Sequence, residues 1–135
     1  MENENKITKQ ARVAGRDLPI STKHAMAICK FLKGKNINEA SSLLEQVIRK
    51  KIAVPFRGEI PHKKGIPGRY PVKASGVFIK LLKSLSSNAS QKGLNTEKLI
   101  ISVGIANLAS RSSKPGRLGR RKFKRTHILL IAEEK

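Results

Sequence analysis

The sequence predicts an α+β fold in which three helices pack on a small antiparallel sheet and a long C-terminal β-hairpin protrudes. Three amphipathic stretches with helical spacing lie between a first short strand and two apolar segments near the end of the chain, the first of which has an alternating pattern. The chain of 135 residues, 39% of them hydrophobic, has room for one domain with a modest core. We expect residues 1–5 to be a disordered acidic terminus and residues 6–135 to form that domain.

The first predicted element is an edge strand over Lys6–Ala14. Its alternation puts three apolar side chains on one face of the strand. These are Ile7, Ala11 and Val13. Gly15 and Pro19 are expected to break the chain between this strand and the first helix.

The first helix is expected to begin after Ser21, a residue type that caps helix N-termini, and to end at Gly34. The apolar positions between them follow helical spacing: Ala25, Ile28, Cys29 and Leu32. Cys29 is the only cysteine, so an intrachain disulfide is excluded, and we expect this residue to be a small buried member of the apolar stripe.

The second helix begins with a capping box, in which Asn36 is the N-cap and Glu39 the third helical residue. Its apolar stripe consists of Ala40, Leu43, Leu44, Val47, Ile48 and Ile52. The cations Arg49, Lys50 and Lys51 follow at the C-terminal end, where the helix dipole favours positive charge. Both a solvated helix end and a contact with an anionic partner are compatible with this run.

Pro55–Pro71 is predicted to be an irregular connection, rich in Pro and Gly, whose cations and apolar anchors suggest order against a partner surface. The third helix is expected over Lys73–Lys92, with Gly93 as its stop signal. Its long apolar stripe is expected to be core. The stripe consists of Ala74, Val77, Phe78, Leu81, Leu82, Leu85 and Ala89.

A basic loop lies inside the predicted hairpin, which covers about residues 99–132. The first arm, Leu99–Ala106, is expected to place Leu99, Ile101, Val103 and Ile105 on one face, and the second arm ends in Ile128–Ile131. The segment from Lys98 to Ala132 contains no Asp or Glu. Between the arms lie Arg111, Lys114, Arg117, Arg120, Arg121, Lys122, Lys124 and Arg125. Because such a loop repels itself and buries no apolar area, its partner is expected to be a polyanion.

The composition indicates nucleic acid. The chain carries 29 Lys and Arg against 9 Asp and Glu, a formal net charge of +20, so the native state is expected to bind counter-charge. With four Phe, one Tyr and no Trp, a single-strand binder built on aromatic platforms is disfavoured relative to phosphate and shape contacts with folded nucleic acid. No apolar run approaches the roughly 20 residues of a membrane span, and the polar, acidic start is unlike a signal peptide. We expect no membrane association and a cytoplasmic location.

Catalytic patterns are missing from the sequence. The nine carboxylates are scattered, and the three histidines, His24, His62 and His127, lie in separate predicted elements. His62 has no His or Cys nearby that would complete a metal site. The chain is therefore expected to be a binding protein that is not an enzyme and that uses no metal or cofactor.

Four motifs in order along the chain resemble the universal large-subunit ribosomal proteins called L-twenty-two in bacteria and L-seventeen in eukaryotes. They are Ile20-Ser21-Thr22-Lys23; Phe31-Leu32-Lys33-Gly34-Lys35 followed by Ala40; Leu81-Leu82-Lys83 with Asn88-Ala89; and Lys124-Arg125-Thr126-His127-Ile128. The segment holding Val54-Pro55-Phe56 and Arg69-Tyr70-Pro71 is similar to the archaeal and eukaryotic branch. The resemblance covers about Lys9–Ile131.

The resemblance implies a body that binds large-subunit ribosomal RNA and a hairpin that lines the nascent-peptide exit tunnel. The implied partners are that RNA, neighbouring large-subunit proteins and the nascent polypeptide, and no homo-oligomer is expected. The residues that charge and resemblance together predict to bind RNA are Lys9, Arg12, Arg16, Lys23, Lys33, Lys35, Arg57, Lys63, Lys64, Arg69, Arg111, Lys114, Arg117, Arg120, Arg121, Lys122, Lys124, Arg125, Thr126 and His127.

One alternative remains open on composition alone, an architectural duplex-DNA-binding protein with a basic β-arm that enters a groove. A duplex binder concentrates its charge on one face. Here the cations occur on the first strand, the helices and the Pro55–Pro71 connection as well as on the hairpin, which suits envelopment by folded RNA.

Overall fold

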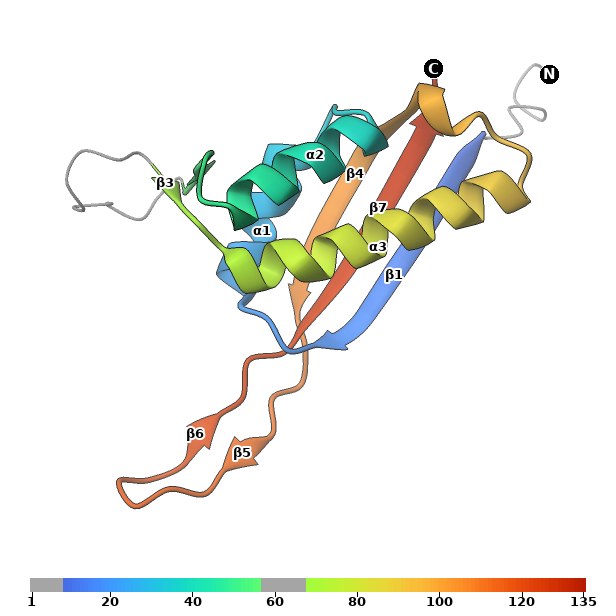
Figure 1. The fold of residues 1–135 in the computed structure, drawn as a ribbon. Helices are drawn as coiled ribbons and strands as arrows, with labels where there is room; N and C mark the ends of the chain where they lie inside the picture. Colours follow the sequence, from blue (N-terminus) through green and yellow to red (C-terminus); the bar gives the residue numbers. More distant parts are fainter. Residues whose placement is uncertain (1–8, 57–67) are drawn as a thin grey trace.

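A three-stranded antiparallel sheet forms the base of the fold, in the order β1-β7-β4. The computed structural model describes residues 9–56 and 68–135. β1 (Gln10–Leu18) and β4 (Leu99–Leu108) both pair with the central strand β7 (Thr126–Glu134), as Figure 1 shows. The predicted α+β class is confirmed, and β1 is an edge strand as expected.

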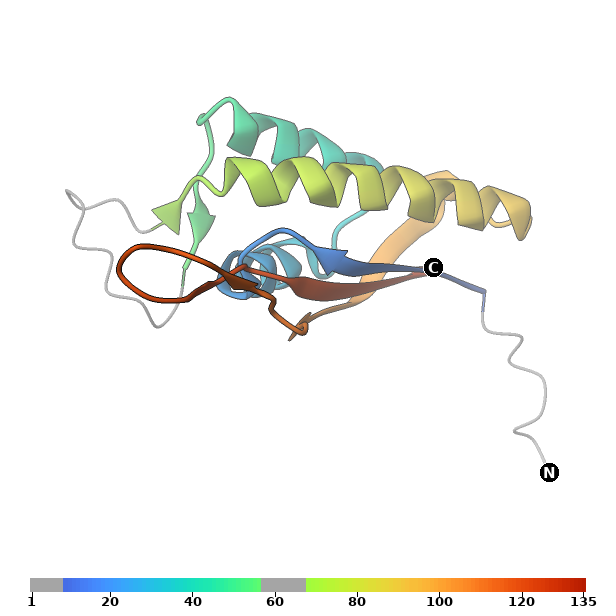
Figure 2. The same cartoon turned by 90° about the horizontal axis from the view of Figure 1, so that it is seen from below.

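Three helices pack against one face of this sheet. α1 (Thr22–Leu32) lies on β4 and α3 (Val72–Gln91) on β1, whereas α2 (Ile37–Ile48) packs against α3. Figure 2 shows α2 and α3 together on the same side of the sheet. A short 3-10 helix, Thr96–Lys98, leads from α3 into β4. The largest fully buried side chains come from both layers: Phe78, Ile28, Leu32, Leu44, Leu82, Leu85, Leu99, Ile101, Ile128, Leu130, Val47 and Val54.

Most helix ends follow the sequence signals, but α2 ends at Ile48, so Ile52 of its predicted apolar stripe lies beyond the helix. Lys50, with a φ of +57°, interrupts the helical backbone before that residue. Gly34 and Gly93 follow α1 and α3 with φ of +82° and +71°, a conformation that L side chains rarely adopt. Asn36 caps α2, because its side-chain oxygen accepts a hydrogen bond of 3.0 Å from the backbone N–H of Asn38. Ser21 occupies the N-cap position of α1 without a side-chain capping bond.

The first strand is displaced from its expected position. Residues 6–8 of the predicted Lys6–Ala14 lie outside the described residues, and β1 continues through Gly15 to Leu18. The expectation that Gly15 breaks the strand is wrong, since Gly15 pairs with Ile128 of β7. A Cβ at this position would lie 2.7 Å from Leu18 Cδ1 and 3.1 Å from Leu81 Cδ2. Glycine therefore lets α3 approach the strand closely.

A β-bulge changes the faces of β4. Ile101 pairs with Ala132 but Val103 pairs with Ile131, so Ser102 is an extra residue in β4. The predicted single apolar face of the first hairpin arm is wrong beyond this point. The extra residue moves the side chains from Val103 onward to the opposite face from the one that the alternation predicts. Ile105 is accordingly 42% exposed, on the face away from the helices.

The ends of the predicted irregular connection are paired. Val54–Pro55 (β2) and Gly68–Arg69 (β3) form a short antiparallel ladder. A Cβ at Gly68 would lie 2.5 Å from the carbonyl oxygen of Val54, so the approach of these two backbones requires glycine. Arg57, Lys63 and Lys64, three of the predicted RNA-binding residues, lie outside the described residues, as do residues 1–5.

Cys29 is buried where α1 crosses β4, as the sequence predicts. The residue is 4% exposed, and a Cβ at Gly104 of β4 would lie 3.2 Å from Cys29 Cβ. Burial of the thiol raises its pKa from 9.0 to about 12. The thiolate that reacts with alkylating agents is therefore scarce in the folded chain at neutral pH.

This burial predicts slow alkylation and a loss of stability at high pH. Iodoacetamide should label Cys29 at pH 8 only after denaturation. Because the folded pKa is raised, the contribution of the thiol to stability is complete below the unfolded value of 9.0 and is lost as pH rises toward 12. Urea unfolding at about pH 8 and about pH 10 should show a fall in stability larger by about 1 kcal/mol in the wild type than in Cys29→Ala. Equal labelling of folded and denatured chain would contradict the prediction.

Candidate nucleic-acid interface

The connection between β4 and β7 projects beyond the end of the sheet. Figure 1 shows this segment, residues 109–125, extending away from the helical layer. Two short strands stiffen it, β5 (Ser113–Lys114) and β6 (Arg121–Lys122), which pair antiparallel. The tip turns at Gly119, which has a φ of +113° and donates its N–H to the carbonyl of Gly116 at 3.3 Å. The structure thus has the protruding hairpin that the sequence predicts.

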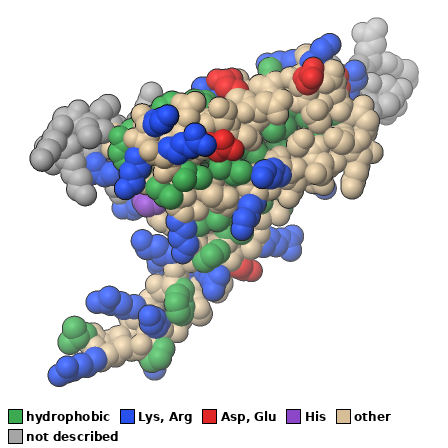
Figure 3. All heavy atoms as spheres, viewed as in Figure 1, with side chains coloured by type: hydrophobic (Ala, Val, Ile, Leu, Met, Phe, Trp, Pro, Cys, Tyr) green, Lys and Arg blue, Asp and Glu red, His purple; other side chains and the backbone are tan. Residues whose placement is uncertain are grey.

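The cations of this projecting hairpin are solvent-exposed, with one exception. Figure 3 shows blue side chains distributed along it. The exposed members are Arg111, Lys114, Arg117, Arg120, Arg121, Lys122 and Lys124. Because the sequence from Lys98 to Ala132 contains no carboxylate, these charges are not neutralised within the hairpin. They form a positive surface along both arms and the tip, which is the chemistry of a phosphate-binding surface.

The root of the hairpin, Arg125–His127, is hydrogen-bonded to the end of β1. Arg125, the half-buried exception, donates a hydrogen bond of 3.1 Å from its guanidinium to the carbonyl of Asp17. The backbone N–H of Asp17 donates to Nδ1 of His127 at 3.2 Å. Asp17 has a φ of +52°, a conformation that is uncommon for a residue with a side chain. Arg125 and His127 therefore join the hairpin to the body in addition to any contact with a ligand.

Thr126 is a correction to the predicted interface. The residue is 0% exposed, and its hydroxyl donates to the carbonyl of Ile20 at 2.9 Å. Since a hydroxyl has one proton, the 2.9 Å contact between Thr22 and Thr126 has Thr22 as donor. The side chain of Thr126 is fully used inside the protein and is not available to RNA.

The corrected role of Thr126 is testable through stability. Thr126→Val removes the donor to the buried carbonyl of Ile20, and we expect the free energy of unfolding to fall by about 1–3 kcal/mol. Thr22→Val leaves that bond intact and should cost less. Urea unfolding measures both variants, and the RNA affinity of folded Thr126→Val should equal that of the wild type. A loss of affinity without a loss of stability would restore Thr126 to the interface.

The body presents cations on several elements. Arg12 and Arg16 of β1 are exposed, and so are Lys23 and Lys33 at the two ends of α1. Arg69 of β3 is half-buried. These positions spread positive charge over the sheet edge, the helical layer and the β2–β3 ladder.

Two further body lysines already have partners within the protein. Lys35 is half-buried, with its ammonium 3.6 Å from Glu39 Oε1 and 5.6 Å from the centre of the Phe31 ring. Lys9 is exposed and lies 4.0 Å from Glu134 Oε2. Each pair has one solvent-exposed member, and pairs that water reaches in this way contribute little to stability, so an anionic ligand can compete for both ammonium groups.

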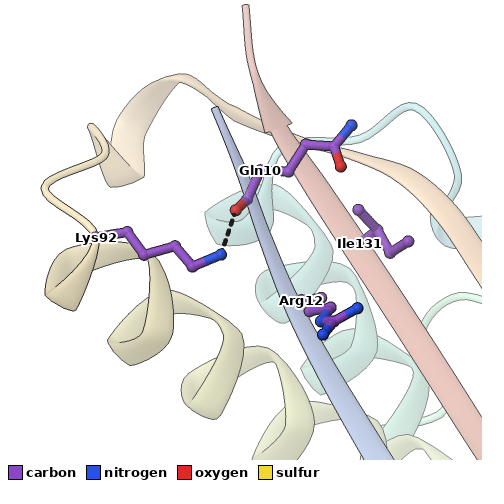
Figure 4. Close-up of a pocket in the computed structure, with 4 residues that line it drawn as sticks. All are labelled: Gln10, Arg12, Lys92 and Ile131. Carbon is purple, nitrogen blue, oxygen red and sulfur yellow. Dashed lines mark hydrogen bonds between the residues drawn. The ribbon is translucent and has the colours of Figure 1, made fainter. Parts of the chain in front are cut away.

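A pocket of about 280 Å³ lies where β1 meets the C-terminal end of α3, lined by Gln10, Arg12, Lys92 and Ile131 (Figure 4). Lys92 Nζ donates to the carbonyl of Gln10 at 2.9 Å, and Asn88 Nδ2 donates to the carbonyl of Arg12 at 3.0 Å. Asn88 of α3 and Lys92, which directly follows α3, thus satisfy outward carbonyls of the edge strand and protect it from pairing with another chain. The sequence patterns predicted no such role for Asn88 and Lys92, although a spacing of four residues at the end of a predicted helix is a usable signal.

Metal-holding side-chain groups and membrane-spanning helices are both missing from the part of the chain that the structure describes. Within residues 9–56 and 68–135, no three His, Cys, Asp or Glu side chains gather as a group able to hold a metal ion. No helix in the same residues has the length and apolar character needed to cross a membrane.

Comparisons with known proteins identify relatives over most of the chain. "Large ribosomal subunit protein uL22" of Methanocaldococcus jannaschii is 43% identical over 138 residues, covering 93% of this chain and 88% of that protein. The protein of the same name from Ignicoccus hospitalis is 40% identical and covers 97% of this chain and 92% of its own length. That of Archaeoglobus fulgidus is 44% identical over 101 residues, which is 70% of this chain and 65% of the relative.

A family model gives the same result. The model described as "Ribosomal protein L22p/L17e" matches residues 13–133, a range that begins within β1 and includes the three helices and the projecting hairpin. The similarity to archaeal proteins agrees with the branch that the Pro55–Pro71 connection indicated. The chain therefore belongs to the ribosomal protein L22p/L17e family.

Proposed function

We propose that this chain binds large-subunit ribosomal RNA through the exposed cations of its hairpin and body, aids the assembly of that RNA, and lines the nascent-peptide exit tunnel with its hairpin. One observation carries the proposal: a projecting segment with seven exposed cations and no carboxylate. Such a segment gains nothing from folding alone, but it releases counterions when it neutralises phosphates. The neighbouring large-subunit proteins and the nascent polypeptide are the other proposed partners.

The family supports the wider setting of this proposal. As a member of a ribosomal protein family, the chain is a structural protein of the cytoplasmic ribosome and not an enzyme. The duplex-DNA alternative is not favoured, because the matching relatives are named as proteins of the large ribosomal subunit. Cations on several elements of the body also suit a ligand that surrounds the protein more than a straight duplex.

The hairpin supplies the shape that tunnel lining requires. Beyond the sheet, its arms are joined by the β5–β6 pairs and by the backbone bonds from Ala109 to Arg125 (3.1 Å) and from Phe123 to Ser112 (2.9 Å). An extended segment rises by about 3.3 Å per residue, so the tip stands well away from the body. We infer that surrounding RNA stabilises this thin element and neutralises its charge.

Sedimentation tests the proposed location. A tagged copy of the full chain is expressed in cells, and the lysate is centrifuged through sucrose gradients at moderate and at high salt. Co-migration with the large ribosomal subunit that survives the high-salt wash is the expected result. Migration with chromosomal DNA, or in the free pool at both salt concentrations, would overturn the proposal.

A further inference from the structure

An aromatic side chain is exposed on the hairpin among its cations. Phe123 is 44% exposed, although large apolar side chains are mostly buried in this fold. Its neighbours in the sequence are Lys122 and Lys124, and the next residue on each side is an arginine, Arg121 before it and Arg125 after it. Figure 3 shows green hydrophobic groups between the blue cations of the projecting segment.

The backbone holds Phe123 at a defined place. Its N–H donates to the carbonyl of Ser112 at 2.9 Å, directly after the pair that joins Lys122 of β6 to Ser113 of β5. The residue on the opposite arm is thus a serine, whose small side chain cannot cover a phenyl ring. Every residue from Ser110 to Lys124 is solvent-exposed, so the hairpin builds no core of its own around the ring.

We propose that Phe123 is a stacking site for one unpaired nucleobase of the RNA that the hairpin binds. The inference deepens the proposed function and rests on it. A nucleobase offers a flat apolar face to the ring, and the phosphates of the same nucleotide are attracted by the adjacent cations, so both parts of the ligand find their chemical complement. We infer an unpaired base because its face is already accessible to the ring. A paired base would first have to be unstacked from its neighbours in the duplex, and each unstacked base step costs energy.

A single stacking residue fixes the register of the RNA strand on a hairpin whose other contacts with RNA are electrostatic. Phosphate contacts by mobile Lys and Arg side chains tolerate many registers along an RNA strand, whereas a base on a fixed ring selects one. Leu118, at the tip, is 93% exposed and aliphatic. Replacing it with alanine therefore removes exposed apolar surface but no aromatic face, which makes it a matched control.

The test measures binding of full-length variants to protein-free RNA extracted from purified large ribosomal subunits. Phe123→Ala and Phe123→Leu should lower the affinity about 5- to 100-fold, and Phe123→Trp should keep it. Leu118→Ala should change the affinity less than about twofold, because an exposed aliphatic side chain offers no stacking. Because the chain contains no Trp, Phe123→Trp also supplies a single tryptophan, whose emission is selectively excited over that of Tyr70 and should be quenched by the bound RNA.

The outcomes separate this inference from the function on which it rests. If the wild type binds the RNA and Phe123→Leu binds equally well, the ring makes no stacking contact and the inference is overturned, whatever the affinity of Phe123→Ala. Failure of the wild type to bind at low salt would instead overturn the proposed function. Thermal unfolding of each variant should match the wild type, since Phe123 lies outside the core, so a lost affinity reports the contact and not the fold.

Discussion

Replacing Arg120, Arg121 and Lys122 with alanine is expected to lower the affinity for large-subunit ribosomal RNA by about 100- to 500-fold at about 0.1 M salt. The three side chains are exposed on the projecting hairpin, at and next to β6. Each lost phosphate contact removes about 0.7–0.9 from the slope of log affinity against log salt, so the slope should flatten by about 2 to 3. Filter binding over a salt series measures both quantities, and an unchanged slope would contradict phosphate contact by these residues.

A matched triple variant separates contact from net charge. Lys73, Lys80 and Lys83 are exposed on α3 and are not among the predicted interface residues. Changing them to alanine removes the same three charges, and alanine is compatible with a helix. We expect a much smaller loss of affinity and a nearly unchanged slope. Equal losses in the two variants would mean that total charge, and not the hairpin, determines binding.

Leu82→Asp is expected to abolish folding of the body. Leu82 is 0% exposed in the middle of α3, and the substitution loses its apolar burial, which is worth about 2–5 kcal/mol in comparable sites. It also places an unpaired carboxylate in the core, at an effective cost of several kcal/mol more. Together these costs approach the total stability of a typical domain, about 5–15 kcal/mol.

The control for this prediction is the same chemical change at an exposed leucine. Leu118 is 93% exposed at the hairpin tip, so Leu118→Asp should shift the free energy of unfolding by less than about 0.5 kcal/mol. Far-ultraviolet circular dichroism and urea unfolding compare the two proteins. A cooperative transition of wild-type stability in Leu82→Asp would show that this position is not in the core.

Signals that act over a few residues were predictable from the sequence. Gly34 and Gly93 end helices because a positive φ is needed there, and Asn36 begins one because its side chain bonds to the N–H of Asn38. The apolar stripe of α3 also predicted five buried positions directly, and the charge pattern predicted a solvent-exposed hairpin. In each of these cases the cause lies within one turn of helix or one arm of a hairpin.

Features that depend on contacts between distant segments were not predictable in this way. Thr126 resembles an interface residue because cations precede it, yet its hydroxyl is buried against Ile20, more than a hundred residues earlier. Glycine is a residue type that often ends a strand, but Gly15 lies inside β1. A glycine is needed there because Leu81 of α3 approaches the strand at that point. The bulge at Ser102 reverses the faces of β4, and nothing in the alternation of Leu99–Ala106 marks where the extra residue falls.

The sequence by itself determined the α+β class, the three helices and most of their ends, the acid-free basic hairpin and the family resemblance, because periodicity, caps and charge are local properties of the chain. Only the tertiary structure decided the strand order β1-β7-β4, the attachment of the hairpin root through Arg125 and His127 to Asp17, and the exposure of Phe123 beside Ser112. These features arise from hydrogen bonds and packing between segments that are far apart along the chain. The residues that contact one another in these features are determined only when the sheet forms and brings β1, β4 and β7 together.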